Sequence, residues 1–125
     1  NINSVEIKFH YCVFTRLLRM EESKFDFGFD FYRSEFRSLI SVFDSEFHGV
    51  FNLQSAQVDI ALDLTKAKFC SGKLSKSIVN LDGATFKAGF NFNKLGFETL
   101  RLRSFFAGAS SSFTDCNIKK PVLSS

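Results

Sequence analysis

The chain has 125 residues, of which 45% are apolar and 23% charged, a composition that fits one globular domain and excludes a disordered chain. Its net charge of +3 is uneven, since residues 1–62 carry nine acids and six bases while residues 63–125 carry four acids and ten bases. The 18 Phe, beside two Tyr and no Trp, indicate one large side-chain shape repeated in similar core positions. We expect a single domain over residues 1–125.

Two features bear on where the protein works. No run approaches the roughly 18 apolar residues that a membrane span needs, and the first thirty residues lack the apolar stretch of a signal peptide. Cys12, Cys70 and Cys116 are odd in number, far apart and without a CxxC pair, which argues against a disulfide framework. We expect no membrane span and a reducing, cytoplasmic location.

From the N-terminus onward, triplets of a small residue, a variable residue and usually Phe recur at steps of eleven residues. They occupy residues 12–14, 23–25, 34–36, 45–47, 56–58 and 67–69, followed after a step of seventeen by 84–86 and 95–97, and after a step of sixteen by 111–113. Such strict spacing indicates an internal repeat.

A second series of triplets reads apolar–polar–apolar and lies five residues ahead of the first. It comprises residues 7–9, 18–20, 29–31, 40–42, 51–53, 62–64, 79–81, 90–92, 100–102 and 116–118. Alternation with a period of two predicts a short β-strand for each triplet, with its flanking residues inside and its central residue outside. A helical stripe of 3.6 residues per turn would drift off this spacing within about two turns.

Corners of two or three residues separate the triplets, and glycines suit such tight bends. The glycines at predicted corners are Gly28, Gly49, Gly72, Gly83 and Gly89. The steps of seventeen and sixteen residues are interpreted as one extra side each, inserted without breaking the winding. The sequence therefore predicts an all-β solenoid with repeats over about residues 7–118 and a short C-terminal tail over 119–125.

The phased series resembles the pentapeptide-repeat family, in particular its Phe-rich branch with alternating five- and six-residue units. Residues 81–86 are the closest single unit, and residues 53–58 and 64–69 follow. The resemblance implies a right-handed quadrilateral β-helix in which a central Leu or Phe, and a small residue two positions earlier, point inward. In half of the sides a large residue replaces the small one, which predicts a wider or less square bore. These large residues are Phe29, Ile40, Phe51, Leu62 and Phe90.

Proteins similar to this family are mostly non-enzymatic, so the resemblance implies a protein-interaction or scaffold module without catalytic residues, cofactor or metal. Its partner would be another protein or a second copy, bound through the faces or the ends of the solenoid, because neither end shows a convincing cap. Some members mimic DNA and bind topoisomerases. That alternative needs a strongly acidic surface and is disfavoured by the net charge of +3.

Several polar residues favour structural interpretations over catalytic or metal sites. His10 and His48 each follow an inward Phe and are expected on the surface, with no nucleophile placed beside them. Asp26, Asp30 and Glu35 lack the ligand spacing of a calcium loop and are expected as solvated charges.

One outward slot of the repeat is rich in amides and carboxylates, which predicts a ladder of side chains along one face. Its members are Asn52, Asn80, Asn91 and Asn117, with Asp30 and Asp63 between them. Among the thiols, Cys12 and Cys116 fall at inward positions, whereas Cys70 follows an inward Phe and is expected to be exposed.

The basic second half contains a candidate partner-binding face. Its residues are expected outside the bore or at corners, and they are Lys66, Lys68, Lys73, Lys76, Lys87, Lys94, Arg101 and Arg103. A binding site for nucleic acid would usually add exposed aromatic side chains, whereas the Phe residues here are assigned to the core. We therefore expect an anionic partner, if any, to meet the C-terminal half of the solenoid.

Overall fold

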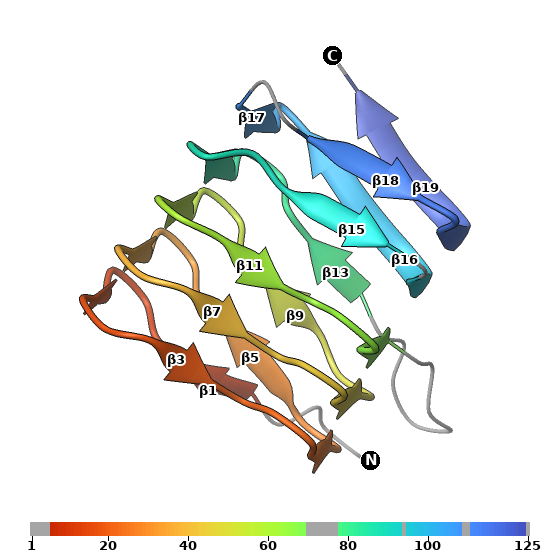
Figure 1. Cartoon of the computed structure of the whole chain (residues 1–125), viewed down its shortest axis with the longest axis horizontal. Helices are drawn as coiled ribbons and strands as arrows, with labels where there is room; N and C mark the ends of the chain where they lie inside the picture. Colours follow the sequence, from red (N-terminus) through yellow and green to blue (C-terminus); the bar gives the residue numbers. More distant parts are fainter. Residues whose placement is uncertain (1–5, 70–77, 94, 109–110, 125) are drawn as a thin grey trace.

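The computed structural model describes residues 6–69, 78–93, 95–108 and 111–124. Over these residues the chain forms 19 strands, paired in parallel, and no helix. Each coil of the chain lies on the coil before it, so the molecule is an all-β solenoid of about five turns (Figure 1). The predicted fold class is confirmed.

Four sides make up each coil. Side one contains β1 (Glu6–Lys8), β5 (Gly28–Asp30), β9 (Phe51–Asn52), β13 (Ile78–Asn80) and the second parts of β16 (Gly96–Arg103) and β19 (Asn117–Ser124). Side two contains β2 (Val13–Phe14), β6 (Glu35–Phe36), β10 (Gln57–Val58), β14 (Thr85–Phe86) and β17 (Phe106–Ala107). Side three contains β3 (Leu18–Arg19), β7 (Ile40–Ser41), β11 (Leu62–Asp63), β15 (Asn91–Asn93) and β18 (Ser112–Thr114), which follow one another in Figure 1. Side four contains β4 (Lys24–Phe25), β8 (Glu46–Phe47), β12 (Lys68–Phe69) and the first parts of β16 and β19 (Asn117–Ser124).

The register between coils follows the spacing of the triplets. Ile7 pairs with Phe29, and Phe29 with Phe51, so that equivalent residues are 22 apart. Further along, Val79 pairs with Leu100, 21 residues on. Four sides of five or six residues each account for both values, which confirms a quadrilateral coil.

Phe side chains fill the bore in repeated positions. On side four, Phe25, Phe47, Phe69 and Phe97 form a continuous stack whose neighbouring ring centroids are 5.2, 5.2 and 5.4 Å apart. The rings of this stack are within 22° of parallel. Offset stacking of aromatic rings adds to the free energy gained by burying them. One slot used once per coil therefore accounts for four of the 18 Phe.

Large and small inward residues alternate around each coil. Phe29, Ile40, Phe51, Leu62 and Phe90 are all buried, and they belong to sides one and three. Sides two and four mostly keep a small buried residue at the equivalent position, whereas Leu95 on side four is large. The small residues are Ser34, Ser45, Ala56, Ala67 and Ala84. The large side chains of sides one and three thus fill the space in the bore that the small residues of sides two and four leave, as close packing requires.

The two irregular steps have different explanations. The step of sixteen residues does hold one more side, β17. The triplet series missed it because Phe105, Phe106 and Ala107 do not follow the order of small residue, variable residue and Phe; Phe106 points outward and is 61% exposed. The interpretation of the step of seventeen was wrong: among the described residues, β12 on side four is followed by β13 on side one, as β8 is by β9, so the coil keeps its four sides there. The additional residues fall in the stretch that includes 70–77, outside the described residues.

Residues 119–124, which the sequence predicted to be a tail, instead continue strand β19 along β16. Pro121 is accommodated opposite Leu100 because β19 lies at the end of its sheet, where a missing N–H leaves no neighbouring strand unpaired. Val122 is half-buried and pairs with Arg101. The repeat therefore runs six residues beyond its predicted limit.

Corners rely less on glycine than the sequence predicted. Gly83 and Gly89 do adopt positive φ, of 68° and 81°, but Gly28 lies within β5, and Gly72 falls outside the described residues. Gly49 is required for close approach, because a Cβ there would lie 2.6 Å from the backbone nitrogen of Gly28. The left-handed corners are mostly formed by other residues with φ between 53° and 59°: Tyr11, Glu22, Arg33, Asp44, Ser55, Lys66, Ser104 and Asp115.

Candidate functional site

The most organised group of polar side chains lies on the outer surface of side one and at its corner with side two. We name it the polar corner. It consists of His10, Asp30, Tyr32, Asn52, Gln54, Asn80, Asp82, Arg101 and Arg103. The outward residues of β5, β9, β13 and β16 form one row along the axis. A second row is formed by His10 after β1 and by the residue two positions after each outward residue of the first row. Since side chains two apart on an extended chain share a direction, the rows lie side by side.

The same local hydrogen bond shapes the corner in successive coils. The side-chain oxygen of Asp30 accepts from the N–H of Tyr32 at 3.1 Å, and that of Asn52 accepts from the N–H of Gln54 at 3.0 Å. Asn80 accepts from the N–H of Asp82 at 3.0 Å in the same way. Asp and Asn favour such turns because the side chain replaces a backbone acceptor. These residues therefore define the corner as well as the surface.

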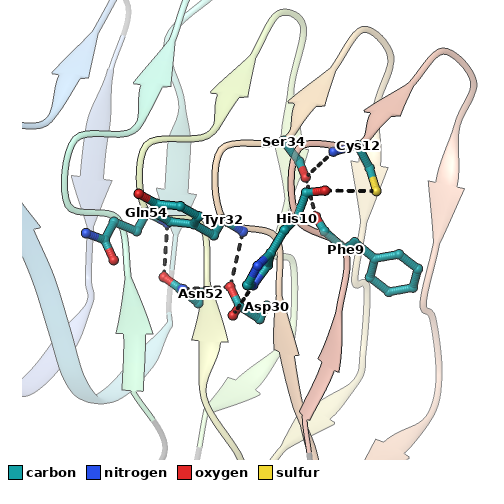
Figure 2. A network of polar contacts seen from close by, with 8 residues as sticks. All are labelled: Phe9, His10, Cys12, Asp30, Tyr32, Ser34, Asn52 and Gln54. Carbon is teal, nitrogen blue, oxygen red and sulfur yellow. Dashed lines mark hydrogen bonds and ion pairs between the residues drawn. The ribbon is translucent and has the colours of Figure 1, made fainter.

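In the N-terminal part of the polar corner, the side chains converge on Asp30 (Figure 2). His10 Nε2 lies 2.6 Å from one carboxylate oxygen, and Asn52 Nδ2 donates to the other at 2.8 Å. Burial raises the pKa of Asp30, but the hydrogen bonds from His10, Asn52 and the N–H of Tyr32 outweigh it and hold that pKa below its ordinary value. Asp30 is therefore an anion at neutral pH.

Beneath this network, buried hydroxyl groups tie neighbouring coils together. Ser34 donates to the carbonyl of Phe9 and accepts from the N–H of Cys12 at 3.1 Å (Figure 2). Ser45 does the same on side four, donating to the carbonyl of Met20 at 2.6 Å. The small inward positions thus accept a polar residue because its hydrogen bonds are satisfied within the coil.

In the C-terminal part of the polar corner, two guanidinium groups share one buried carboxylate. Arg101 Nε and Arg103 Nε donate to Asp82 Oδ2 at 3.0 and 3.1 Å, and Nη2 of each lies 3.0 Å from the same oxygen. The N–H of Arg103 donates to Asp82 Oδ1 at 2.8 Å. Burial raises the pKa of Asp82, but the hydrogen bonds from Arg103 and Arg101 outweigh this effect and hold the pKa below its ordinary value.

A shallow hollow of about 320 Å³ opens beside this pair of arginines. Its lining is polar and consists of Gln54, Ser55, Asp82, Gly83, Arg103 and Ser104. Ser55, Gly83 and Ser104 occupy the same left-handed corner in three successive coils. A Cβ at Gly83 would lie 3.2 Å from Ser55 Oγ, so the absence of a side chain in the middle coil leaves room for the hollow.

The structure separates most residues of the predicted basic face. Arg101 and Arg103 lie together at the polar corner. Lys66 lies at the corner before side four, and Lys68 lies in β12 on side four. Lys87 follows side two, with its Nζ 3.5 Å from a carboxylate oxygen of Asp59. Lys73, Lys76 and Lys94 fall outside the described residues. The contacts of Asp82 with both arginines were not predicted, because Arg101 and Arg103 follow Asp82 by 19 and 21 residues in the sequence.

The predicted amide ladder is split among three sides. Asn52 and Asn80 do share side one with Asp30, but Asn91 pairs with Ser112 on side three, and Asn117 pairs with Gly96 on side four. The prediction of one shared slot was wrong for two reasons. Alternate triplets of the same series lie on opposite sides of the coil, and β17 adds a side before residues 116–118, which moves Asn117 to side four.

Histidines and thiols behave partly as predicted. His10 and His48 point outward, yet each contacts a carboxylate, at 2.6 Å for Asp30 and 2.5 Å for Glu46. The hydrogen bond from His48 is the main cause of a lowered pKa at Glu46. Cys12 and Cys116 are free thiols and only half-buried, whereas Cys70 lies outside the described residues.

No cluster of three or more metal-ligating side chains occurs within the described residues. In that part of the chain, no helix is long and apolar enough to cross a membrane. Comparison with protein-family models, with curated proteins and with solved structures finds no match to this chain.

Proposed function

We propose that the protein is a non-catalytic interaction module that recognises another protein through the polar corner. The observation that carries this proposal is that Asp30 and Asp82, the buried carboxylates of that surface, are both held as anions by fixed partners. A general acid or base works best when its pKa lies near the operating pH. Carboxylates with lowered pKa values are suited instead to accepting hydrogen bonds and holding neighbouring side chains in place.

The shape of the surface supports the same proposal. Each coil adds one outward residue and one corner residue, about 4.8 Å from the next, so that the polar corner is a flat strip along the axis. Side chains fixed by hydrogen bonds lose little conformational entropy when a partner binds. A preorganised polar strip beside a shallow hollow therefore fits protein recognition better than enclosure of a small substrate.

The pentapeptide-repeat family remains our proposal for the ancestry of the fold, on the strength of the five- and six-residue units and the four-sided coil. DNA mimicry is less favourable, because Asp30 and Asp82 are each matched by basic neighbours and cannot imitate a row of free phosphates. Free thiols at Cys12 and Cys116 fit a reducing compartment such as the cytoplasm.

The proposal is tested by affinity capture from the native source with three forms of the protein: wild type, Gln54→Glu and Asn91→Asp. Both substitutions turn an amide into a carboxylate of the same shape, but Gln54 lies at the polar corner and Asn91 is exposed on side three. We expect wild type and Asn91→Asp to retain the same partner and Gln54→Glu to lose most of it. A wild-type protein that captures nothing above background would refute the interaction function.

A further inference from the structure

We propose that the hollow beside Asp82 binds an oxyanion, the carboxylate or phosphate group of an acidic segment of a partner protein, through Arg103 with help from Arg101. The inference rests on the proposed interaction function and names the chemistry of its partner. Three observations support it: the net positive charge of Asp82 with the two arginines, the N–H donors of the arginines that Asp82 does not use, and the space that Gly83 leaves open.

The charges at this site do not cancel. Asp82 contributes one negative charge, and Arg101 and Arg103 contribute one positive charge each, which leaves one positive charge beside the hollow. The side chain of Asp82 is 9% exposed, whereas those of Arg101 and Arg103 are 31% and 49% exposed. The anion is thus covered while the cations face outward, so a ligand approaching the hollow meets a positive surface.

The arginines also retain unused donors. A guanidinium group has five N–H donors and no acceptor. Within the described residues, each of these two groups directs only Nε and Nη2 toward Asp82, which leaves three donors on each. Planar guanidinium groups held in place by a buried carboxylate can bind a carboxylate or phosphate with two parallel hydrogen bonds.

The rest of the lining complements this chemistry. The N–H groups of Ser55 and Gly83 donate to the carbonyls of Asp82 and Arg103 in the following coil, at 2.8 and 2.7 Å. Since these two N–H groups are already used, the other hydrogen bonds to a bound oxyanion must come from side chains. The hydroxyl groups of Ser55 and Ser104 and the amide of Gln54 supply them. Gly83 keeps the space between the two serines open. A small oxyanion fits both the room and the donors.

A protein segment is favoured over nucleic acid as the source of the oxyanion. Binding of single-stranded nucleic acid usually requires aromatic side chains on which bases stack. Both Tyr residues of the chain, Tyr11 and Tyr32, lie in the first two coils, with ring centroids 5.9 Å apart. The residues that line the hollow are Gln, Ser, Asp, Gly and Arg, with no aromatic among them, and the exposed Phe106 belongs to strand β17 on side two, outside that lining.

The test is a titration of the full chain, followed through backbone amide shifts in NMR spectra. Inorganic phosphate, a glutamate-rich peptide and a single-stranded oligonucleotide serve as separate probes. We expect saturable shifts at residues 54–55, 82–83 and 103–104 with phosphate and with the peptide, and tighter binding of the peptide. Shifts spread over the exposed lysines, no saturation, or preference for the oligonucleotide would overturn the proposal.

Three variants complete the experiment. Arg103→Gln should weaken phosphate binding at least about tenfold, as loss of a charged hydrogen-bonding group does. Gly83→Asn should block the hollow and still fold, because non-glycine residues hold this conformation at Ser55 and Ser104. Arg37→Gln, which removes a charge on side two, should bind within about twofold of wild type. An equal loss in Arg37→Gln would contradict a specific site.

If Arg103→Gln fails to fold, Arg103→Lys provides the same comparison. It keeps the positive charge but not the planar pair of donors, and we expect it to weaken phosphate binding several-fold. Unchanged binding would overturn the role of Arg103. Failure of this inference differs from failure of the interaction function: a partner captured equally by wild type and Arg103→Gln would refute the site alone.

Discussion

The interior of the solenoid and its polar corner follow different rules along the same axis. Inside, each coil repeats the one before, as the stack of Phe25, Phe47 and Phe69 illustrates. Outside, the corner position changes in every coil, from His10 through Tyr32 to Asp82. Repetition serves packing, since one ring shape fits the space left by another. The corner is free of that requirement and can differ from coil to coil, as recognition of a partner demands.

The largest expected effect of this difference is on stability. Phe86 is fully buried, and Phe86→Ala should lower the free energy of unfolding by about 3–5 kcal/mol. Thr85→Ala, one residue away and pointing outward, should change it by no more than about 0.5 kcal/mol. Urea denaturation midpoints measure both. Equal shifts for the two variants would show that the inward and outward assignments are wrong.

A smaller effect is expected within the polar corner. Asp82→Asn removes the charge that Arg101 and Arg103 share, and it should cost about 1–3 kcal/mol, because hydrogen bonds to charged groups are lost. Asp59→Asn, whose carboxylate lies 3.5 Å from the exposed Lys87, should cost less than about 1 kcal/mol. The comparison uses the same denaturation assay. A neutral Asp82→Asn would mean that the arginines do not depend on this carboxylate.

The lowered pKa values make stability depend on pH in a defined direction. Asp30 and Asp82 both have pKa values below the ordinary carboxyl value in the folded protein. Their contribution to the free energy of unfolding is therefore complete above that ordinary value, and it is lost as the pH falls from there toward the folded pKa values. We expect the denaturation midpoint to fall at acid pH and to fall less in Asp30→Asn/Asp82→Asn. A double variant with an unchanged slope would contradict the assignment.

The smallest effect concerns the left-handed corners. Glu22 is exposed with a φ of 53°, a conformation that costs a non-glycine residue about 1 kcal/mol. Glu22→Gly should therefore be neutral or stabilising by about 0.5 kcal/mol, although glycine also gains entropy in the unfolded chain. Lys24→Gly, within strand β4, should instead destabilise by about 0.5–1 kcal/mol. Thermal melting distinguishes the two signs, and destabilisation by Glu22→Gly equal to that of Lys24→Gly would contradict the prediction.

The sequence predicted the interior well because packing imposes a period on it. Triplets such as residues 34–36 and 45–47 lie where expected, with their flanking residues buried. Strand β17 shows the limit of that approach, since its inward residues Phe105 and Ala107 reverse the order of small residue and Phe that the pattern required.

The candidate site was harder to predict, because it depends on register between coils. Arg101 and Arg103 were expected to belong to a basic surface, but nothing in their spacing identifies Asp82 as their partner. The coil spacing is 22 residues early in the chain and 21 later, and six additional residues intervene after β12. A shift of one residue would place different side chains beside each other.

The central claim is that the interior stabilises the protein while the polar corner recognises the partner. It is tested most directly by measuring the free energy of unfolding and the amount of captured partner for two variants, Val58→Ala and Gln54→Glu. We expect Val58→Ala to lose about 2 kcal/mol of stability, since Val58 is buried, yet to capture the partner while it is folded. Gln54→Glu should keep its stability within about 0.5 kcal/mol and lose the partner. Loss of partner and stability together in Gln54→Glu, or loss of the partner by folded Val58→Ala, would contradict the claim.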